Sequence, residues 1–493
     1  MSSGGRVLVL LALARLALYL LIDNQYGFHR DELATLDDAR ALAWGYVAYP
    51  PLTPFLARVE LSLFGPSLVG VRVLSAVAQC VAMVLTGLMA SELGGKRWAQ
   101  VVAALAAGSA PISLTEGALF QYVAFDYLWW VLICYCSLRL LNSRDMRWWL
   151  AIGVVAGLGL LTRYTIGVLL VGLSAGVLIT GKWHWFSQRW PWMGVSLALL
   201  LWLPNLIWQL EHGFVSLEFL SAIHARDVAI GRARGYLPEQ LFVSTNPLTM
   251  PIWILGLWFY LFSRDGKPHR LLGWLFVVPF VLLLVTQGRS YYLGPAYPVL
   301  IAAGSVVVER WLAARGEVLR RLSQTVVAVG LALAWTVGGA LSLPLAPIGS
   351  GVWNVASKVN DNFAEEVGWP DLVATVASIY AQLPADSTGI LAGNYGEAGA
   401  VDLYGPAFGL PPAISGADSY WYRGYPDPPP QAVVVVGYGA NELAALFMRC
   451  DLAGQVTNPY GVKNEEASHP QIFVCRAPRQ PWPEMWQMLR QFE

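Results

Sequence analysis

Two neighbouring acidic side chains, Asp31 and Glu32, stand in a polar stretch that follows the first apolar run of the chain. The residues after them fit an amphipathic helix, because the apolar side chains at 33, 36, 39 and 43 fall on one face. Asp31 opens this helix. A carboxylate there either caps the first backbone amides or acts as a base at a membrane surface, and the pair alone allows both interpretations.

A third acidic side chain, Asp126, stands at the start of a strongly apolar run. A charge in or near a membrane is costly, so such a residue marks a functional site unless it only caps the interface. Glu116 lies nearby and competes for the same role. We predict that Asp31 is a catalytic base, and that Glu32 and Asp126 orient it or the substrate.

Two arginines in separate breaks between apolar runs, Arg163 and Arg289, form the next candidate feature, and Tyr291 and Tyr292 follow the second of them. Arginine at a membrane surface often contacts only lipid phosphates. Its planar guanidinium also binds two phosphate oxygens at once, so these four residues predict a site for a phosphate carried on a lipid. Further candidates for this phosphate site are Arg58 and Arg72.

The composition indicates that these residues belong to a membrane protein. Of 493 residues, 56% are hydrophobic and 13% are charged, whereas a soluble domain is about 45–50% apolar and about 25% charged. The 22 tryptophans suit the boundary between membrane and water. Because 32 basic residues balance 32 acidic ones, a basic nucleic-acid-binding protein and an acidic disordered chain are excluded. We therefore predict a polytopic α-helical membrane protein.

About 11 transmembrane helices are expected, since a span needs roughly 20 apolar residues. The expected spans are 7–22, 68–91, 98–118, 124–141, 148–162, 164–180, 191–210, 247–263, 271–287, 294–309 and 324–343. Short basic joints alternate with longer acidic joints between these runs. The positive-inside rule then places the N-terminus in the cytoplasm and the C-terminal residues outside the cytoplasmic (inner) membrane. The first run has no clear cleavage site and is expected to stay as an anchor.

The depth of Arg163 follows from helix geometry. The chain between Arg147 and Thr162 rises about 23 Å at 1.5 Å per residue, which just reaches the far side of the membrane. Arg163 is therefore expected slightly below the outer surface, facing the same compartment as the loop that carries Asp31. Residues 211–246 form a long outer joint, which we predict to be a mobile loop over the site.

Apolar runs stop after residue 343, and the remaining sequence is typical of a soluble α/β domain. Residues 344–493 hold 15 acidic and 7 basic side chains, with candidate strands at 389–392, 432–436 and 471–475. We predict a transmembrane catalytic domain at 1–343, with outer-loop amphipathic helices at about 30–65, and an extracytoplasmic domain at 344–493.

The two cysteines of the C-terminal domain, Cys450 and Cys475, are its only ones. Outside the cytoplasm a disulfide between them is chemically permitted. The sequence does not supply the geometry that a disulfide requires, so a pair of free thiols remains the alternative.

Several of these residues resemble bacterial members of the glycosyltransferase family 39 group, which are similar to protein O-mannosyltransferases and to the lipid A aminoarabinose transferase. The resemblance is carried by 28–33, 44–47, 50–52, 125–126 and 394–398, and it extends over most of the chain. It implies the GT-C fold and transfer of a sugar from a polyprenyl phosphate to an acceptor at the outer face. By the resemblance, Asp31 matches the catalytic acid of the family and Asp126 matches its second acidic residue.

The chain departs from the aminoarabinose branch at one position. In that branch a lysine precedes a pair of prolines and contacts the donor phosphate, whereas here Tyr49 precedes Pro50 and Pro51. We therefore assign the donor phosphate to Arg163 and Arg289, and predict that Tyr49, Pro50 and Pro51 form a substrate loop. The departure also argues against assigning the aminoarabinose reaction itself.

The predicted function is an inverting hexosyl or pentosyl transfer from a polyprenyl-phosphate-linked sugar donor to a glycan, lipid or protein acceptor, with membrane lipids as further partners and no nucleic acid. No cofactor or metal is expected, because the sequence shows no ligand cluster of recognisable spacing and no nucleotide motif. The alternative is a polytopic transporter or lipid flippase, with Asp126 and Arg15 as intramembrane charges. A transporter predicts internal repeats, and none is evident. A binding protein remains possible if the acidic pair only caps a helix.

Overall fold

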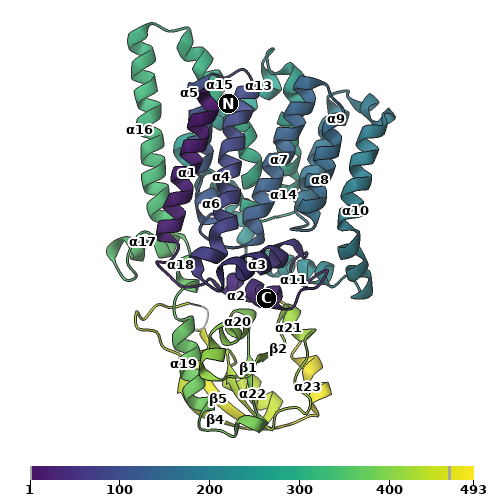
Figure 1. Ribbon diagram of the computed structural model, residues 1–493, viewed down its shortest axis with the longest axis vertical. Coiled ribbons are helices and arrows are strands. Elements are labelled where there is room, and N and C mark those ends of the chain that lie inside the picture. Colours follow the sequence, from purple (N-terminus) through teal and green to yellow (C-terminus); the bar gives the residue numbers. More distant parts are fainter. Residues whose placement is uncertain (1–2, 465–467) are drawn as a thin grey trace.

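The computed structural model describes residues 3–464 and 468–493. A layer of long helices occupies one end of the molecule and a small α/β part occupies the other, so that the N-terminus lies far from the sheet (Figure 1). The helices of the first part that coincide with the expected spans are α1 (Ser3–Ile22), α4 (Leu68–Glu92), α5 (Arg97–Gly108), α7 (Tyr122–Ser143), α8 (Trp148–Leu160), α9 (Ile166–Ile179), α10 (Arg189–Glu211), α13 (Met250–Phe262), α14 (Arg270–Val285), α15 (Tyr297–Ala313) and α16 (Glu317–Ser342).

Seven helices of the described residues are long and apolar enough to cross a membrane, or eight if the bent pair Arg232–Phe242 and Pro247–Phe262 is one span. The other expected spans correspond to α5, α8 and α9, which have 12, 13 and 14 residues. Helices of this length rise about 18–21 Å, less than the roughly 30 Å of a hydrocarbon core. By length alone, these three helices are shorter than a hydrocarbon core is thick.

The run at 98–118 is not the continuous helix that its apolar sequence predicts. Helix α5 ends at Gly108, and the short helix α6 (Pro111–Thr115) follows. Pro111 has no backbone N–H, so it cannot continue the hydrogen bonds of α5 but fits the first position of a new helix. The correction places Glu116 at the end of α6.

Two helices lie across the end of the helical layer that faces the sheet, α2 (Arg30–Arg40) and α3 (Leu52–Phe64) (Figure 1). Helix α2 begins with a capping box, because the His29 ring accepts from the Asp31 amide at 3.2 Å and Glu32 accepts from the His29 amide at 2.8 Å. The long joint at 211–246 holds α11 (Val215–Ala229) and α12 (Tyr236–Phe242). These helices surround the region where the candidate residues meet.

The C-terminal part is built on a five-stranded sheet with strand order β2-β1-β3-β5-β4. Strands β2, β1 and β3 are parallel to one another, and β5 is antiparallel to both β3 and β4. Its elements are α17 (Gly351–Val359), α18 (Asn362–Glu365), α19 (Trp369–Tyr380), β1 (Thr388–Ala392), α20 (Tyr395–Tyr404), β2 (Ala413–Ser415), α21 (Asp418–Trp421), β3 (Ala432–Val436), α22 (Ala440–Leu446), β4 (Phe447–Gln455), β5 (Gln471–Pro478) and α23 (Trp482–Met488).

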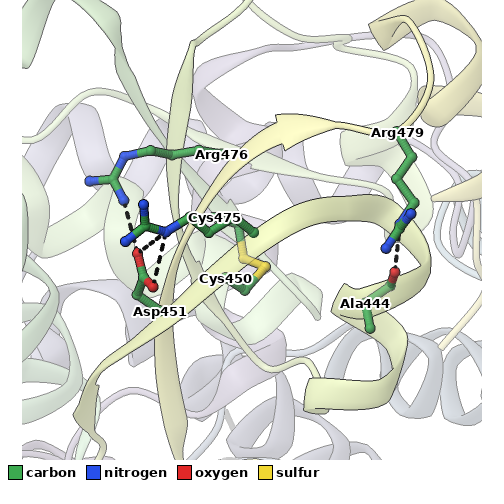
Figure 2. The surroundings of a disulfide bond; sticks show 7 residues. Ala444, Cys450, Asp451, Cys475, Arg476 and Arg479 are labelled. Carbon is green, nitrogen blue, oxygen red and sulfur yellow. Dashed lines mark hydrogen bonds and ion pairs between the residues drawn. A yellow bond between two sulfur atoms is a disulfide. The ribbon is translucent and has the colours of Figure 1, made fainter.

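The expected strands coincide with β1, β3 and β5, whereas β2 and β4 gave no clear signal in the sequence. Strand β2 has three residues, and β4 is mostly exposed, so neither forms a long apolar run. Cys450 of β4 lies opposite Cys475 of β5, and a disulfide joins them, as Figure 2 shows. The three other cysteines are buried free thiols in the helical part.

Candidate active site

The Asp31 carboxylate is held at both oxygens by groups from distant segments. Its Oδ1 accepts from the Tyr395 hydroxyl at 2.8 Å, and its Oδ2 accepts from the Gln121 amide at 3.1 Å. The side chain remains 32% exposed. Each carboxylate oxygen has a further lone pair, so this group has the fixed orientation and the access that a base requires.

Glu32 points away from Asp31 into a buried ion pair. Its two oxygens accept from Arg72 at 2.8 and 2.6 Å and from the Phe120 and His29 amides at 2.8 Å each. Arg72 also pairs with Glu366 of the C-terminal part at 3.3 Å. Burial raises the pKa of Glu366 to about 8, and Arg72 opposes that shift. Glu32 therefore holds the loop in place, and Arg72, a candidate for phosphate, is already engaged.

We expect Glu32→Gln to destabilise the protein strongly, because it leaves the buried Arg72 without its main counter-charge. Breaking a buried pair costs about 3–5 kcal/mol. The measurement is the free energy of unfolding of the purified protein in one detergent. Glu92→Gln is the matched control, since the Glu92–Arg139 pair is 26% and 35% exposed and such pairs contribute only about 0–1 kcal/mol. Equal losses in the two variants would contradict the prediction.

Asp126 lies one turn into α7 and contacts the turn between α8 and α9. Its Oδ2 accepts from the Thr165 hydroxyl at 2.8 Å, and the positive charge of Arg163 acts on it. Among the described hydrogen bonds, none joins Asp126 to Asp31. Asp126 therefore belongs to the cationic side of the site, where its hydrogen bond with Thr165 holds the turn that contains Arg163.

Arg163 and Arg289, predicted from separate breaks, meet at the hydroxyl of Tyr291. An Arg163 nitrogen lies 3.2 Å from this oxygen, and an Arg289 nitrogen lies 3.5 Å from it. The Arg163 guanidinium also lies 4.8 Å from the ring centre of Tyr122 and 4.4 Å from that of Tyr292. We call these five residues the arginine–tyrosine cluster. Arg163 is only 9% exposed, so an anion that reached it would be largely shielded from water.

Asp227 of α11 is a partner that the sequence did not indicate. Its two carboxylate oxygens accept hydrogen bonds from Arg289 nitrogens at 2.5 and 3.1 Å. An Arg232 nitrogen lies 3.5 Å from the same carboxylate. Burial raises the pKa of Asp227, but the two arginines outweigh this effect and hold that pKa below its usual value. Among the described ion pairs, Arg163 has no carboxylate of this kind, so Arg163 is the cation of the cluster that is better placed for an incoming phosphate.

A dipeptide at the start of α7 joins Asp31 to the arginine–tyrosine cluster. Gln121 donates to Asp31, and the ring of the next residue, Tyr122, lies against Arg163. The charges of Asp31 and Arg163 both act on Glu116, which is buried beside them. The carboxylate and the cations thus share one region at the end of the helical layer.

The predicted substrate loop borders this region. The Tyr49 ring packs 5.6 Å from that of Tyr122, and its hydroxyl donates to Asp38 at 2.6 Å. Burial raises the pKa of Asp38 to about 8, and the Tyr49 hydrogen bond opposes the shift. Pro50 and Pro51 lead into α3, whose first residue Leu52 donates to the Leu161 carbonyl at the end of α8 at 2.9 Å.

Arg58 does not join the arginine–tyrosine cluster. It lies on the exposed face of α3 with Phe55 and Val59, whereas Ala57 and Glu60 form the buried face. Among the described residues, no hydrogen bond or ion pair connects its side chain to Arg163 or Arg289. The charge of Arg58 could be read from the sequence, whereas the face of α3 on which it lies could not.

The C-terminal part covers the site through contacts with α2. Arg423 pairs with Asp37 and Asp38, and Arg40 donates to the Asp402 carbonyl at 2.7 Å. These contacts place the start of α20 next to Asp31 (Figure 1). Among the described residues, no group of three or more His, Cys, Asp or Glu side chains could hold a metal ion.

Comparisons with known proteins identify relatives of this chain and of its fold. Residues 48–208 match the family model described as dolichyl-phosphate-mannose-protein mannosyltransferase. Undecaprenyl phosphate-alpha-4-amino-4-deoxy-L-arabinose arabinosyl transferase 1 of Pseudomonas fluorescens is 26% identical over 300 residues, which are 56% of this chain and 51% of that protein. The chain thus spans about half the length of the curated relative that it matches.

Two solved structures share the fold over nearly the whole chain. Apo ArnT from Cupriavidus metallidurans matches with a TM-score of 0.59 and 15% identity, over 95% of this chain and 97% of that one. The same protein bound to undecaprenyl phosphate matches with a TM-score of 0.56 and 15% identity, over 96% and 98%. The chain therefore has the GT-C membrane fold that its sequence predicts, with a small C-terminal sheet.

Proposed function

We propose that this protein is a glycosyltransferase that moves a sugar from a polyprenyl-phosphate donor to an acceptor at the outer face of the cytoplasmic membrane. The observation that carries the proposal is the junction at Gln121 and Tyr122, which places a part-exposed carboxylate beside the arginine–tyrosine cluster. The GT-C fold, and the undecaprenyl phosphate bound to ArnT, support a donor of this class.

The geometry supports an inverting displacement. Asp31 takes the proton of the acceptor hydroxyl while that oxygen bonds to the anomeric carbon of the sugar. The bond between this carbon and the phosphate oxygen breaks, and its electron pair leaves with the polyprenyl phosphate. Arg163 stabilises the negative charge that develops on the leaving phosphate. Gln121 contacts the Asp31 carboxylate and the adjacent Tyr122 contacts Arg163, so the proposed base and the proposed phosphate ligand lie in one region.

The distribution of charge supports an outer location for the site. The joint at Lys96 and Arg97, which opens α5, and the basic end of α15 lie at the end of the helical layer remote from the sheet (Figure 1). By the positive-inside rule this end faces the cytoplasm, and the C-terminal part lies outside. The acceptor is then a glycan, lipid or protein that the outer surface of the membrane presents, and the sugar is a hexose or a pentose.

The direct test is transfer of a labelled sugar from synthetic polyprenyl-phosphate sugars to cell-envelope glycolipid by the purified protein. Release of polyprenyl phosphate in step with labelled product supports the proposal. Transport of the lipid-linked sugar across a vesicle membrane without release of phosphate would support the flippase alternative and overturn the proposal.

Arg289→Ala is expected to weaken the binding of undecaprenyl phosphate by about tenfold, because one guanidinium of the cluster is lost. The effect is moderate because Asp227 already neutralises part of this charge. Titration of the lipid into detergent-solubilised protein, followed by native mass spectrometry, measures the dissociation constant. Arg264→Ala, at an exposed position between α13 and α14, is the control. Unchanged affinity in Arg289→Ala would remove Arg289 from the phosphate site.

A further inference from the structure

Helix α20 of the C-terminal part begins at the Asp31 carboxylate. Tyr395, the first residue of this helix, is separated from Asp31 by 364 positions and donates its hydroxyl to Oδ1 at 2.8 Å. The Arg30 guanidinium lies over the Tyr395 ring, 5.1 Å from its centre. A group from the far end of the sequence thus contacts the proposed base directly.

The local sequence fixes the position of Tyr395. Asn394 caps α20 by accepting from the Glu397 amide at 2.8 Å, and Glu397 accepts from the Gly393 and Asn394 amides at 3.0 and 3.3 Å. This capping box satisfies backbone amides at both sides of Tyr395. The tyrosine therefore stands at a defined helix start and not on a free loop.

Two glycines let α20 approach α2 closely. A Cβ atom at Gly399 would lie 2.7 Å from the backbone carbon of Leu33, and one at Gly396 would lie 2.8 Å from Cβ of Arg30. Both distances are too short for a side chain, so only glycine allows this packing. The spacing of Asn394, Tyr395, Gly396 and Gly399 is explained if the task of this segment is to bring the hydroxyl to Asp31.

We propose that Tyr395 is a positioning residue of the transfer reaction, and that α20 completes the active site rather than only covering it. The inference rests on the proposed function of Asp31 as the base. Tyr395 fixes Oδ1, and Gln121, which precedes α7, fixes Oδ2, so the plane of the carboxylate is set by the two parts of the molecule together. The remaining lone pairs are left for the acceptor hydroxyl.

Tyr395 serves as a donor and not as a competing base. Burial and the Asp31 charge raise the pKa of its hydroxyl well above the usual value, so it keeps its proton. Removal of this donor frees the carboxylate to rotate.

Other charged and titratable groups face Asp31 from each neighbouring element. These are His29 and Arg30 of its own loop, Glu116 and Tyr122 around α6 and α7, Glu365 of α18, and Asp418 of α21. All of them remain in Tyr395→Phe. A change in the pH dependence of that variant therefore reports the loss of one hydroxyl.

The experiment compares Tyr395→Phe and Gly399→Ala with two controls in the full-length protein. In Tyr395→Phe we expect kcat to fall by about tenfold to hundredfold, the usual effect of losing a hydrogen bond to a charged group. Its pH–rate profile is expected to differ from that of the wild type, because the Asp31 carboxylate has lost one hydrogen-bond donor. The affinity for undecaprenyl phosphate should stay at the wild-type value, because the arginine–tyrosine cluster is untouched.

Gly399→Ala provides a route to the same result without altering Tyr395. The added methyl group should push α20 from α2, lower kcat similarly, and speed hydrogen exchange in residues 30–40. Tyr380→Phe is the control for a lost hydroxyl, since that group donates to the Ala385 carbonyl elsewhere. Gly351→Ala is the control for an added methyl group, since nothing lies within 4 Å of its Cβ position.

The outcomes separate this inference from the proposed function. If the wild type is active and Tyr395→Phe keeps the wild-type kcat and pH profile, the role of Tyr395 is overturned. The transferase proposal then still stands. A wild type that transfers no sugar from any polyprenyl donor overturns the proposed function, and the role of Tyr395 falls with it. If hydrogen exchange in residues 30–40 is unchanged in Gly399→Ala, the close packing at the glycines is not what holds Tyr395 against Asp31.

Discussion

Asp31→Asn is expected to lower kcat by about 10³-fold, within the range that general base catalysis contributes. The amide of asparagine cannot accept the proton of an acceptor hydroxyl, yet it nearly matches the carboxylate in shape. The Tyr395 hydroxyl can still donate to its oxygen, so the local structure should persist. The measurement is the single-turnover rate of transfer from a labelled polyprenyl-phosphate sugar, with enzyme in excess.

The affinity for undecaprenyl phosphate distinguishes a lost base from a damaged site. Asp31→Asn should bind this lipid as the wild type does, because its phosphate is assigned to the arginine–tyrosine cluster. Asp145→Asn, in the exposed turn between α7 and α8, is the matched control and should retain full activity. Turnover by Asp31→Asn at the wild-type rate would exclude Asp31 as the base.

Arg163→Ala is expected to lower kcat by about 10³-fold and to weaken the binding of undecaprenyl phosphate more than Arg289→Ala does. Removing one preorganised donor to a developing negative charge costs about 10²–10³ in rate. Among the described ion pairs, Arg163 has no direct carboxylate partner like the Asp227 of Arg289, so more of its charge is available to the donor.

Arg163→Lys separates charge from geometry. Lysine keeps the positive charge but loses the planar group that lies against Tyr122 and Tyr292. We expect a rate between those of the wild type and Arg163→Ala. Arg139→Ala is the control, because that arginine pairs with Glu92 at the opposite end of the helical layer. If Arg163→Ala had the same donor affinity and transfer rate as Arg139→Ala, the assignment of the donor phosphate to Arg163 would be refuted.

The residues of the site that sequence could predict are those with a local cause. Asp31 opens a helix directly after an apolar run, and Arg163 stands in the break between two apolar runs. Tyr291 was predicted because it stands two positions from Arg289, and its hydroxyl is the atom at which the two arginines meet. The membrane class and fold followed from apolar runs and from the resemblance around Asp31.

The partners that sequence missed lie far away along the chain. Tyr395 and Asp31 are 364 positions apart, Gln121 and Asp31 are 90 apart, and Asp227 and Arg289 are 62 apart. No periodic pattern marks pairs at such separations, because tertiary packing alone decides them. The same limit explains Glu32, whose charge looked catalytic until its buried partner Arg72 was known.

The ion pair of Arg72 with Glu366 crosses the division of the chain at residue 343. Fragments cut at this position are therefore unsuited to separate expression. One fully buried cation on α4 balances Glu32 of the outer loop and Glu366 beyond the last long helix. A recombinant fragment starting at residue 344 would carry Glu366 without its counter-charge, and a truncated helical fragment would leave Arg72 short of one neighbour. Crystallographic or binding studies of either half alone would therefore describe a molecule whose docking face had been chemically altered by the cut.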